Sequence, residues 1–227
     1  MRIFAIADLH LSFSSNKPME IFGENWKNHY EKIKKSWLDR VSKDDLVLVP
    51  GDISWAMNLD EAYLDLKWIS DLPGKKVLLR GNHDYWWKSK KRLDDKFSDI
   101  NFLQNNSYVF NNVAIFGTKG CAISDNLSEH DEVLINREII RLELSLNSLK
   151  DKKIDRKICI MHYPPILKGI KEYRFVEIFN KYGVDCVVYG HLHNKNNFEQ
   201  AIVGRHNGID YYLVSSDYLD FKVEEII

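Results

Sequence analysis

Hydrophobic and polar residues alternate along this chain with two different periods, and each period predicts one kind of secondary structure. Short apolar runs rich in β-branched residues predict buried strands, at 2–7, 46–49, 76–80, 157–161 and 185–189. Longer stretches whose apolar residues recur every three or four positions predict helices, at 24–40, 58–71, 86–97, 129–151 and 171–182. Strands that alternate with helices in this way are typical of an α/β protein whose sheets are flanked by helices.

Two further regions consist of short strands separated by turns. Their predicted ranges are 101–103, 107–110 and 113–117 in the middle of the chain, and 198–203 and 209–214 near its end. Asn58 or Asp60 is expected to cap the helix at 58–71. Because the chain contains no internal repeat, low-complexity tract or linker rich in Pro, Gly and Ser, we expect one domain over residues 1–227.

The composition excludes several classes of protein. With 44% hydrophobic and 29% charged residues, the chain has enough apolar surface for a core and is not expected to be disordered. Lys and Arg number 32 and Asp and Glu number 33, so the overall charge does not attract the protein to nucleic acid or to an acidic membrane. We therefore expect neither of them as a partner.

The cysteines and the length of the apolar runs predict a cytoplasmic protein. Cys121, Cys159 and Cys186 are too few for a disulfide framework, and the last two lie in apolar runs, so we expect buried and reduced thiols. The first residues lack the features of a signal peptide. No apolar run approaches the length of about 18 residues that is needed to span a membrane.

Polar residues able to bind metal follow the predicted strands at the point where each strand ends. These residues are Asp8, His10, Asp52, Asn82, His83, His162, His191 and His193. The carboxyl ends of the strands in an α/β sheet meet at one edge, where ligands bind. In addition, the D-x-H and H-x-H pairs place both side chains on the same side of an extended segment. The sequence therefore predicts one site built from five strand ends.

Without His83, this set offers four imidazoles, two carboxylates and one amide, and it contains no thiolate. Such a mixture of nitrogen and oxygen donors suits Mn²⁺, Fe or Zn²⁺, and we expect two divalent or trivalent ions, with Mn²⁺ as the first choice. Seven ligands exceed the three that usually hold a single catalytic zinc ion. They suffice for two ions if one carboxylate bridges them.

Two adjacent ions are suited to displacement at phosphorus, because together they can hold a hydroxide nucleophile and the phosphoryl oxygens. His83 lies beside a predicted ligand but is surplus to the shell, so it is available as a general acid or as a phosphate stabiliser. The residues therefore predict metal-dependent hydrolysis of a phosphomonoester or phosphodiester.

Five ordered motifs resemble those of the calcineurin-like metallophosphoesterase superfamily. They are D-L-H at 8–10, G-D-I-S-W at 51–55, G-N-H-D at 81–84, M-H-Y-P-P at 161–165 and G-H-L-H at 190–193. The resemblance implies a four-layer αββα sandwich, in which two mixed β-sheets are flanked by helices. It also implies one ion held by Asp8, His10, Asp52 and His193, and another held by Asp52, Asn82, His162 and His191. Asp52 is then the bridge, and His83 is the catalytic residue outside the shell.

The chain departs from one branch of that superfamily. The phosphoprotein phosphatases have an acidic residue that supports the catalytic histidine and an arginine that grips phosphate, and neither has a match here. Whether Asp84 supports His83 instead is left open. The chain is more similar to small bacterial phosphohydrolases, and we expect a small phosphate ester as its substrate, with a nucleotide among the candidates.

Two other functions are compatible with this fold. A binding scaffold that has lost catalysis is disfavoured because every motif is intact, and a nuclease is disfavoured because such enzymes carry additional domains for duplex binding. Specificity depends on loops such as 11–23 and 118–130, whose conformation does not follow from composition. The sequence therefore specifies neither the physiological substrate nor the oligomeric state.

Aromatic residues beside the motifs have two interpretations. Trp55, Trp86 and Trp87 either roof the metal cleft and stack on substrate, or pack in the core. The histidines outside the motifs, His29, His130 and His206, have polar neighbours and are interpreted as surface residues.

Overall fold

The computed structural model describes residues 1–149, 153–171 and 173–226. Five strands form the first sheet: β1 (Ile3–Ala5), β2 (Leu46–Pro50), β3 (Lys75–Leu79), β4 (Ile100–Leu103) and β11 (Glu224–Glu225). Their order is β11-β1-β2-β3-β4. The pairs from β1 to β4 are parallel, and β11 adds one antiparallel edge strand.

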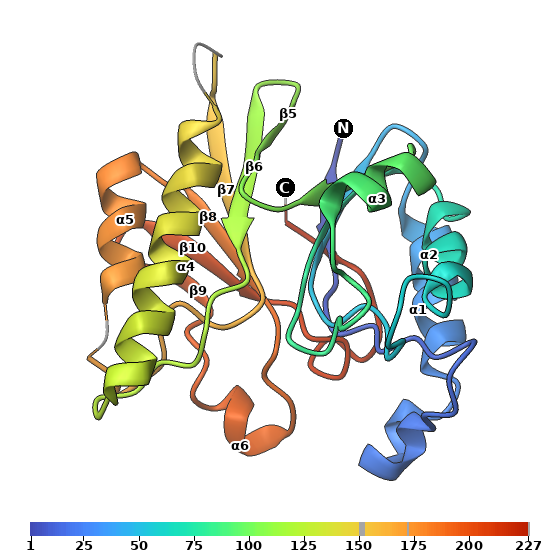
Figure 1. Ribbon diagram of the computed structural model, residues 1–227. Helices are drawn as coiled ribbons and strands as arrows, with labels where there is room; N and C mark the ends of the chain where they lie inside the picture. Colours follow the sequence, from blue (N-terminus) through green and yellow to red (C-terminus); the bar gives the residue numbers. More distant parts are fainter. Residues whose placement is uncertain (150–152, 172, 227) are drawn as a thin grey trace.

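The second sheet lies beside the first (Figure 1). It contains β5 (Tyr108–Phe110), β6 (Val113–Thr118), β7 (Arg156–Met161), β8 (Cys186–Tyr189), β9 (Gly204–His206) and β10 (Ile209–Leu213). The order is β5-β6-β7-β8-β10-β9, with antiparallel pairs at both edges and parallel pairs between them. Both sheets are therefore mixed, as expected.

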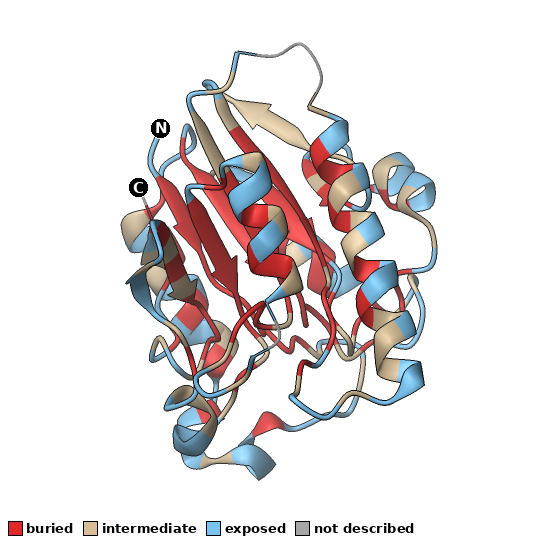
Figure 2. Ribbon diagram, turned by 90° about the vertical axis from the view of Figure 1, so that its left-hand side faces the viewer, coloured by how far each residue is buried: buried red, intermediate tan, exposed pale blue. Residues whose placement is uncertain are grey.

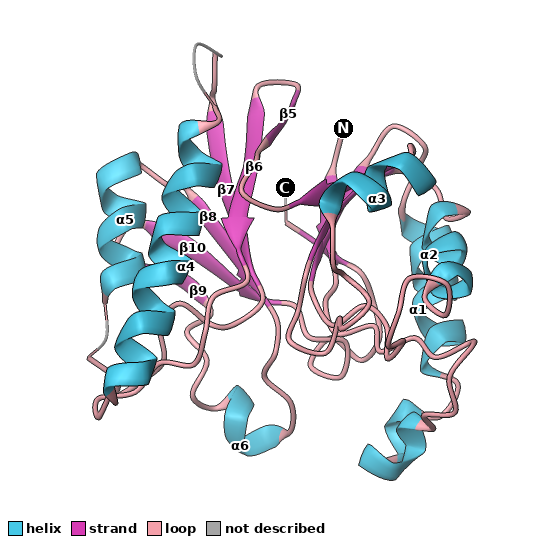
Figure 3. Ribbon diagram, in the orientation of Figure 1, coloured by secondary structure: helices cyan, strands magenta, loops and turns pink. Residues whose placement is uncertain are grey.

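Helices cover the outer faces of both sheets (Figures 1 and 3). On the first sheet lie α1 (His29–Arg40), α2 (Tyr63–Ser70) and α3 (Lys90–Lys96), and on the second lie α4 (Glu129–Asn147) and α5 (Arg174–Tyr182). Three short helices, η1 (Met19–Phe22), η2 (Glu24–Trp26) and α6 (Lys195–Phe198), lie at the other end of the molecule from the chain termini. This arrangement confirms the four-layer αββα sandwich.

The central strands are largely buried on both faces, which explains why they are nearly continuous apolar runs in the sequence (Figure 2). In β2, Val47 and Val49 pack in the cluster beneath α1 and α2, whereas Leu46 and Leu48 pack in the cluster between the sheets. That central cluster also contains Ile158 of β7 and residues of β8. Because strand side chains alternate between the two faces, each strand joins two layers of the sandwich.

The strand predicted at 198–203 is wrong. Residue 198 ends α6, and the next strand begins only at Gly204. The side chain of Asn194 accepts a hydrogen bond from the backbone N–H of Asn197 and so starts a helical turn. The helix cap at Asn194 therefore favours a helical turn here, although the short apolar pattern predicts a strand.

The predicted helices have different boundaries in the structure, and the one predicted at 86–97 begins only at Lys90, as α3. The helix predicted at 24–40 is divided at Asn28, whose φ of 53° lies in the left-handed region, so that α1 begins only at His29. The helix predicted at 58–71 begins at Tyr63, and the Asn58 side chain instead accepts from Asp60 and Glu61 in the preceding turn. Of the helices predicted at 129–151 and 171–182, residues 150–151 and 172 lie outside the described residues.

The three cysteines are buried and free, as expected. Burial raises the pKa of Cys121 to about 11 and that of Cys186 to about 12, so both thiols stay protonated at neutral pH. Among the described residues, no helix is both long and apolar enough to cross a membrane.

Candidate metal centre

All eight residues predicted for the site lie in the loops that follow the carboxyl ends of β1, β2, β3, β7 and β8. In Figure 1 this edge of both sheets is the lower one, on the same side as α6. The structure therefore brings together residues that are separated by more than 180 positions in sequence: the Oδ2 atom of Asp8 accepts a hydrogen bond from the backbone N–H of His191 at 2.9 Å.

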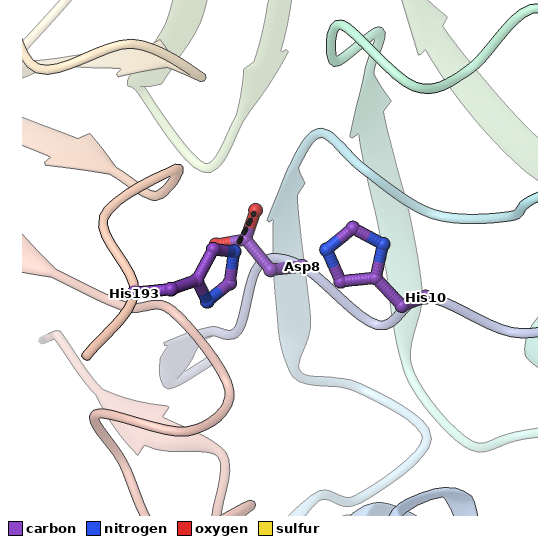
Figure 4. A group of neighbouring side chains, drawn as sticks. All are labelled: Asp8, His10 and His193. Atoms are coloured by element: carbon purple, nitrogen blue, oxygen red, sulfur yellow. Dashed lines mark ion pairs between the residues drawn. The ribbon is translucent and has the colours of Figure 1, made fainter. Parts of the chain in front are cut away.

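One group of donor atoms consists of Asp8, His10 and His193, whose nearest ligand atoms all lie within 4.8 Å of one another. The Nε2 atom of His193 is 3.8 Å from Oδ1 of Asp8. Figure 4 shows the imidazole of His193 beside this carboxylate and the imidazole of His10 on the opposite side. A cation between them would contact two nitrogen donors and one oxygen donor.

A second group consists of Asp8, Asp52 and His162, again within 4.8 Å. The Nε2 atom of His162 lies 2.6 Å from Oδ1 of Asn82, 3.2 Å from Nδ1 of His191 and 3.5 Å from Oδ1 of Asp52. The two groups are joined through the Asp8 carboxylate, while Asp52 belongs to the second group and its Oδ2 atom lies 3.8 Å from Nε2 of His10.

The backbone at the site is not extended, contrary to the reasoning from the D-x-H and H-x-H spacing. Asp8, His10, Asp52 and His191 have φ angles of 58°, 44°, 50° and 72°. Such left-handed conformations are costly for non-glycine residues and are typical of functional sites. The loops after β1 and β2 are joined here by two backbone hydrogen bonds. The N–H groups of Asp8 and His10 donate to the carbonyl oxygens of Gly51 and Asp52, both at 3.0 Å.

Two glycines allow the loops to approach one another. A Cβ atom on Gly81 would lie 2.2 Å from Oδ1 of Asp52, and one on Gly190 would lie 2.6 Å from Oδ2 of Asp8. Any side chain at these positions would collide with a predicted ligand. The glycines before the N-H and H-x-H motifs are therefore required by packing against the carboxylates.

Three of the four imidazoles predicted as ligands are neutral without a bound ion, and the fourth, His193, would give up a proton on binding one. Burial lowers the pKa values of His10, His162 and His191 to about 3, so these imidazoles are neutral and have a free lone pair. Burial raises the pKa of Asp8 to about 7, with His193 opposing the rise. Burial also disfavours a charged His193, but Asp8 and Asp217 outweigh it and raise the pKa to about 9.

Three buried polar atoms of the site have no hydrogen-bond partner among the described residues: Oδ1 of Asp8, Nδ1 of His10 and Nδ1 of His83. Buried polar groups are normally satisfied, and an unpaired one costs about 1–3 kcal/mol. A bound cation would satisfy Oδ1 of Asp8 and would compensate the adjacent buried carboxylates, whereas the nitrogen of His10 that lies toward Asp52 is Nε2. The residues present therefore fit two metal ions.

Asp84 does not orient His83, which answers the question that the sequence left open. Its carboxylate accepts hydrogen bonds from the backbone N–H groups of Gly81, Ile53 and Ser54 at 2.7, 2.9 and 3.1 Å, and from Nε1 of Trp86 at 3.0 Å. Burial raises the pKa of Asp84 to about 7, and these N–H donors oppose the rise. Asp84 thus ties the loop after β2 to the loop after β3.

The imidazole of His83 is held by an aromatic neighbour. Its ring lies 4.5 Å from the ring of Trp55, which also stacks on His10 at 4.8 Å with an interplanar angle of 20°. The His83 side chain is 36% exposed, and its Nε2 atom lies 4.0 Å from Oδ2 of Asp52. His83 is therefore next to the donor groups but open to the solvent side.

The three tryptophans beside the motifs lie in two different environments. Trp86 and Trp87 are each only 1% exposed and belong to the core beneath the first sheet, whereas Trp55 is partly exposed at the site.

The prediction that His29 is a surface residue is wrong. It is 6% exposed, and its two ring nitrogens lie 3.1 Å from the carbonyl oxygen of Trp26 and 2.9 Å from that of Leu9.

Sequence reasoning missed Asp217. Its Oδ1 atom lies 2.9 Å from Nδ1 of His193, and its Oδ2 atom accepts from the backbone N–H of Asn194 at 3.4 Å. Asp217 follows β10, and β10 pairs in parallel with β8, so its position obeys the same rule as the other residues. The sequence signal was the acidic residue in SSD after the run YYLV.

Comparisons with known proteins agree with this architecture. The sequence profile of the family described as calcineurin-like phosphoesterase matches residues 1–195. Among curated proteins, the Gene 66 protein of Mycobacterium phage L5 is 36% identical over 78 residues, which are 34% of this chain and 37% of that protein. The chain thus spans little more than a third of this relative.

Three solved structures have a similar fold. A phosphopantetheinyl hydrolase from Mycobacterium tuberculosis has a TM-score of 0.59 at 14% identity, covering 100% of this chain and 95% of its own. The protein TT1561 of Thermus thermophilus has a TM-score of 0.60 at 14% identity, with coverages of 99% and 97%. The protein AQ665 of Aquifex aeolicus, of unknown function, has a TM-score of 0.53 at 18% identity, with coverages of 99% and 95%.

Proposed function

The chain belongs to the calcineurin-like phosphoesterase family, a family of metal-dependent hydrolases, and from this premise we propose that it hydrolyses a phosphomonoester or phosphodiester with two metal ions. The observation that carries the proposal is the pair of donor groups at one edge of the sheets: both contain Asp8, and Asp52 of the second group also lies 3.8 Å from His10 of the first. Each group combines carboxylate and imidazole donors, which is the chemistry expected for Mn²⁺, Fe or Zn²⁺.

In this proposal one ion is held by Asp8, His10, Asp52 and His193, and the other by Asp52, Asn82, His162 and His191. When bound, the ions would act as Lewis acids toward the phosphoryl oxygens and make water a nucleophile near neutral pH. Mn²⁺ is the metal that we propose first.

The hydrogen bonds around two histidines support one nitrogen of each as the proposed ligand atom. The carbonyl oxygen of Pro50 lies 3.1 Å from Nδ1 of His162, and a carbonyl can only accept, so Nδ1 carries the proton. The carboxylate of Asp217 likewise holds a proton on Nδ1 of His193. We therefore take Nε2 of both residues as the proposed ligand atom, which its position near Asp52 and Asp8 supports.

His83 is proposed to act on the substrate and not on a metal. Its backbone N–H donates to Oδ1 of Asp52 at 2.9 Å, which fixes the loop, while its partly exposed ring is free to move a proton. A proton on Nε2 could pass to the leaving oxygen or stabilise a phosphoryl oxygen.

We propose a cytoplasmic enzyme that acts on a small phosphate ester. A scaffold without catalysis receives less support because all eight site residues are present and gathered at one edge. A nuclease receives less support because the chain is not basic overall. At 14% identity the likeness to the mycobacterial hydrolase carries the fold alone, so its substrate is not transferred to this chain.

The test is metal-dependent hydrolysis by purified protein. Metal-free protein, prepared with a chelator, is assayed with p-nitrophenyl phosphate, bis-p-nitrophenyl phosphate and a nucleotide panel, before and after addition of Mn²⁺, Zn²⁺ or Fe²⁺. We expect metal to restore hydrolysis of at least one ester. Protein that binds two ions per chain but hydrolyses none of these esters would favour the scaffold.

A further inference from the structure

A cleft of about 590 Å³ opens directly beside the candidate metal centre. One end of it is formed by residues of the centre, among them His10, Asp52 and His83. The volume lies within the range of about 300–1,000 Å³ that is typical of small-molecule sites. A phosphate held at the centre would therefore have room for its organic group in the same cleft.

Beside the residues of the metal centre the cleft has an apolar wall, part of which packs directly on His10. Met19, Phe22, Trp26, Trp55 and Phe198 form this wall. Trp26 and Met19 are each 4% exposed, and Nε1 of Trp55 points at the sulfur of Met19 at 3.1 Å. Because these three side chains are packed against one another and against the core, the floor of the cleft is already formed without a ligand.

Two phenylalanines at the mouth of the cleft belong to separate elements. Phe22 ends η1 and is 61% exposed. Phe198 ends α6. Its ring packs edge-to-face with the ring of Tyr218, and their centroids are 5.1 Å apart. In Figure 1, α6 and the blue segment that contains η1 and η2 both stand at the lower edge of the molecule.

Polar side chains complete the cleft at its rim, where Asn25 and Asn194 are exposed. Amide side chains both donate and accept hydrogen bonds, so they suit the edge of a heteroaromatic ring better than an aliphatic chain. Aromatic walls likewise favour a flat ligand, because rings stack on one another in offset or edge-to-face arrangements.

From these observations we infer that the cleft binds the organic group of the substrate, that this group is a flat aromatic or heteroaromatic ring, and that Phe22 and Phe198 are the residues that select it. The inference rests on the proposed function, since it places the phosphate of the same molecule at the metal centre. An aliphatic group of similar size is the alternative occupant that the experiment must exclude.

Binding of phosphonates tests the inference without hydrolysis. Phenylphosphonate, cyclohexylphosphonate and methylphosphonate share the anionic group and differ only in the group that would enter the cleft. Their dissociation constants are measured by calorimetry on protein loaded with Mn²⁺. We expect phenylphosphonate to bind roughly 5- to 100-fold more tightly than methylphosphonate, the range expected for one stacked ring. It should also bind more tightly than cyclohexylphosphonate.

The variants Phe22→Ala and Phe198→Ala should each reduce the preference for phenylphosphonate and leave methylphosphonate binding unchanged. Ile21→Ala is the matched control, because Ile21 lies on the same short helix, is 74% exposed and does not line the cleft. Phe22→Leu keeps an apolar side chain without a ring and should behave like Phe22→Ala. Equal melting temperatures of parent and variants would show that folding is unaffected.

Two results would overturn the inference: equal binding of the phenyl and cyclohexyl compounds by the parent, or the same phenyl preference in both Phe variants as in Ile21→Ala. A different result would contradict the proposed function. Protein that retains the phenyl preference but hydrolyses no ester with two ions bound would contradict the proposed hydrolysis and support the cleft assignment.

Discussion

Two buried carboxylates at opposite ends of the sheets, Asp45 and Asp8, differ in how far hydrogen bonds satisfy their oxygen atoms. At the amino end, Asp45 precedes β2, and its oxygens accept from the backbone N–H groups of Arg2 and Ser42 at 2.8 and 3.0 Å and from both of their side chains at 2.8 Å. At the carboxyl end, Asp8 follows β1, and one of its oxygens has no partner among the described residues.

The same contrast holds for proton affinity. Burial alone would raise the pKa of Asp45, but the hydrogen bonds from Ser42 and Arg2 hold it well below its usual range. For Asp8, burial dominates and raises the pKa to about 7. The comparison teaches that Asp45 at the amino end is satisfied by the protein's own donors, as Asp84 is at the carboxyl end, whereas Asp8 keeps an oxygen atom free for a ligand. The predictions below test this difference, from the largest expected effect to the smallest.

Asp52→Asn should remove all metal-dependent activity, because the proposed bridging ligand serves two ions at once. It should also remove most of the stabilisation that Mn²⁺ gives the folded protein, which is about 2.7 kcal/mol at 100 times the dissociation constant. Elemental analysis and melting curves with and without chelator measure both effects. Asp45→Asn is the control that should keep its response to metal. If the Asp52 variant still holds two ions at full activity, Asp52 is not the bridge.

His83→Ala should lower kcat by roughly 10²–10⁴, the range for a positioned acid or base, while two ions remain bound. The loss should be smaller for p-nitrophenyl esters if His83 acts mainly as a general acid, because that group leaves without a proton. His130→Ala, on an exposed histidine, is the control. Unchanged kcat on every hydrolysed ester would refute the catalytic role, and loss of one ion would make His83 a ligand.

Asp217→Ala should weaken Mn²⁺ binding about 10- to 100-fold, the usual effect of removing the partner that orients a metal-binding histidine. The kcat of the fully loaded variant should change little, because Asp217 contacts His193 and not the reacting groups. Calorimetric titration with Mn²⁺ measures the affinity. Asp220→Ala, which removes a surface carboxylate paired with Lys222, should leave the affinity unchanged. Equal affinities for the two variants would show that Asp217 does not orient a ligand.

Asp45→Asn should lower the free energy of unfolding by about 1–3 kcal/mol at pH 7, because the variant loses charge-assisted hydrogen bonds in a buried position. The folded-state pKa of Asp45 is depressed, so its contribution is complete above the unfolded value of about 3.9 and is lost as pH falls toward the folded value. Denaturant titrations should therefore show parent and variant converging below about pH 4. A constant difference down to pH 3 would mean that the charge of Asp45 does not contribute.

The sequence by itself determined the central strands and which residues gather at the candidate site. Apolar runs such as 46–49 and 157–161 are buried on both faces, so their pattern alone predicts β2 and β7. Polar residues directly after such runs must gather at one edge, because parallel strands place their carboxyl ends together. This is why His162 and Asp8 could be placed in one site although 154 residues separate them in sequence.

Only the tertiary structure decided what each polar side chain contacts. Asp84 lies beside His83 in sequence but binds the loop after β2, and Asp217 lies far from His193 but binds its ring. Trp55 and Trp86 follow similar motifs, yet one lines the cleft and the other lies in the core. Periodicity reports whether a residue faces the core, since burial repeats with the helix or strand. The hydrogen-bond partners of a loop residue depend on which loops the sheets bring together. Which loops meet is a property of the whole fold.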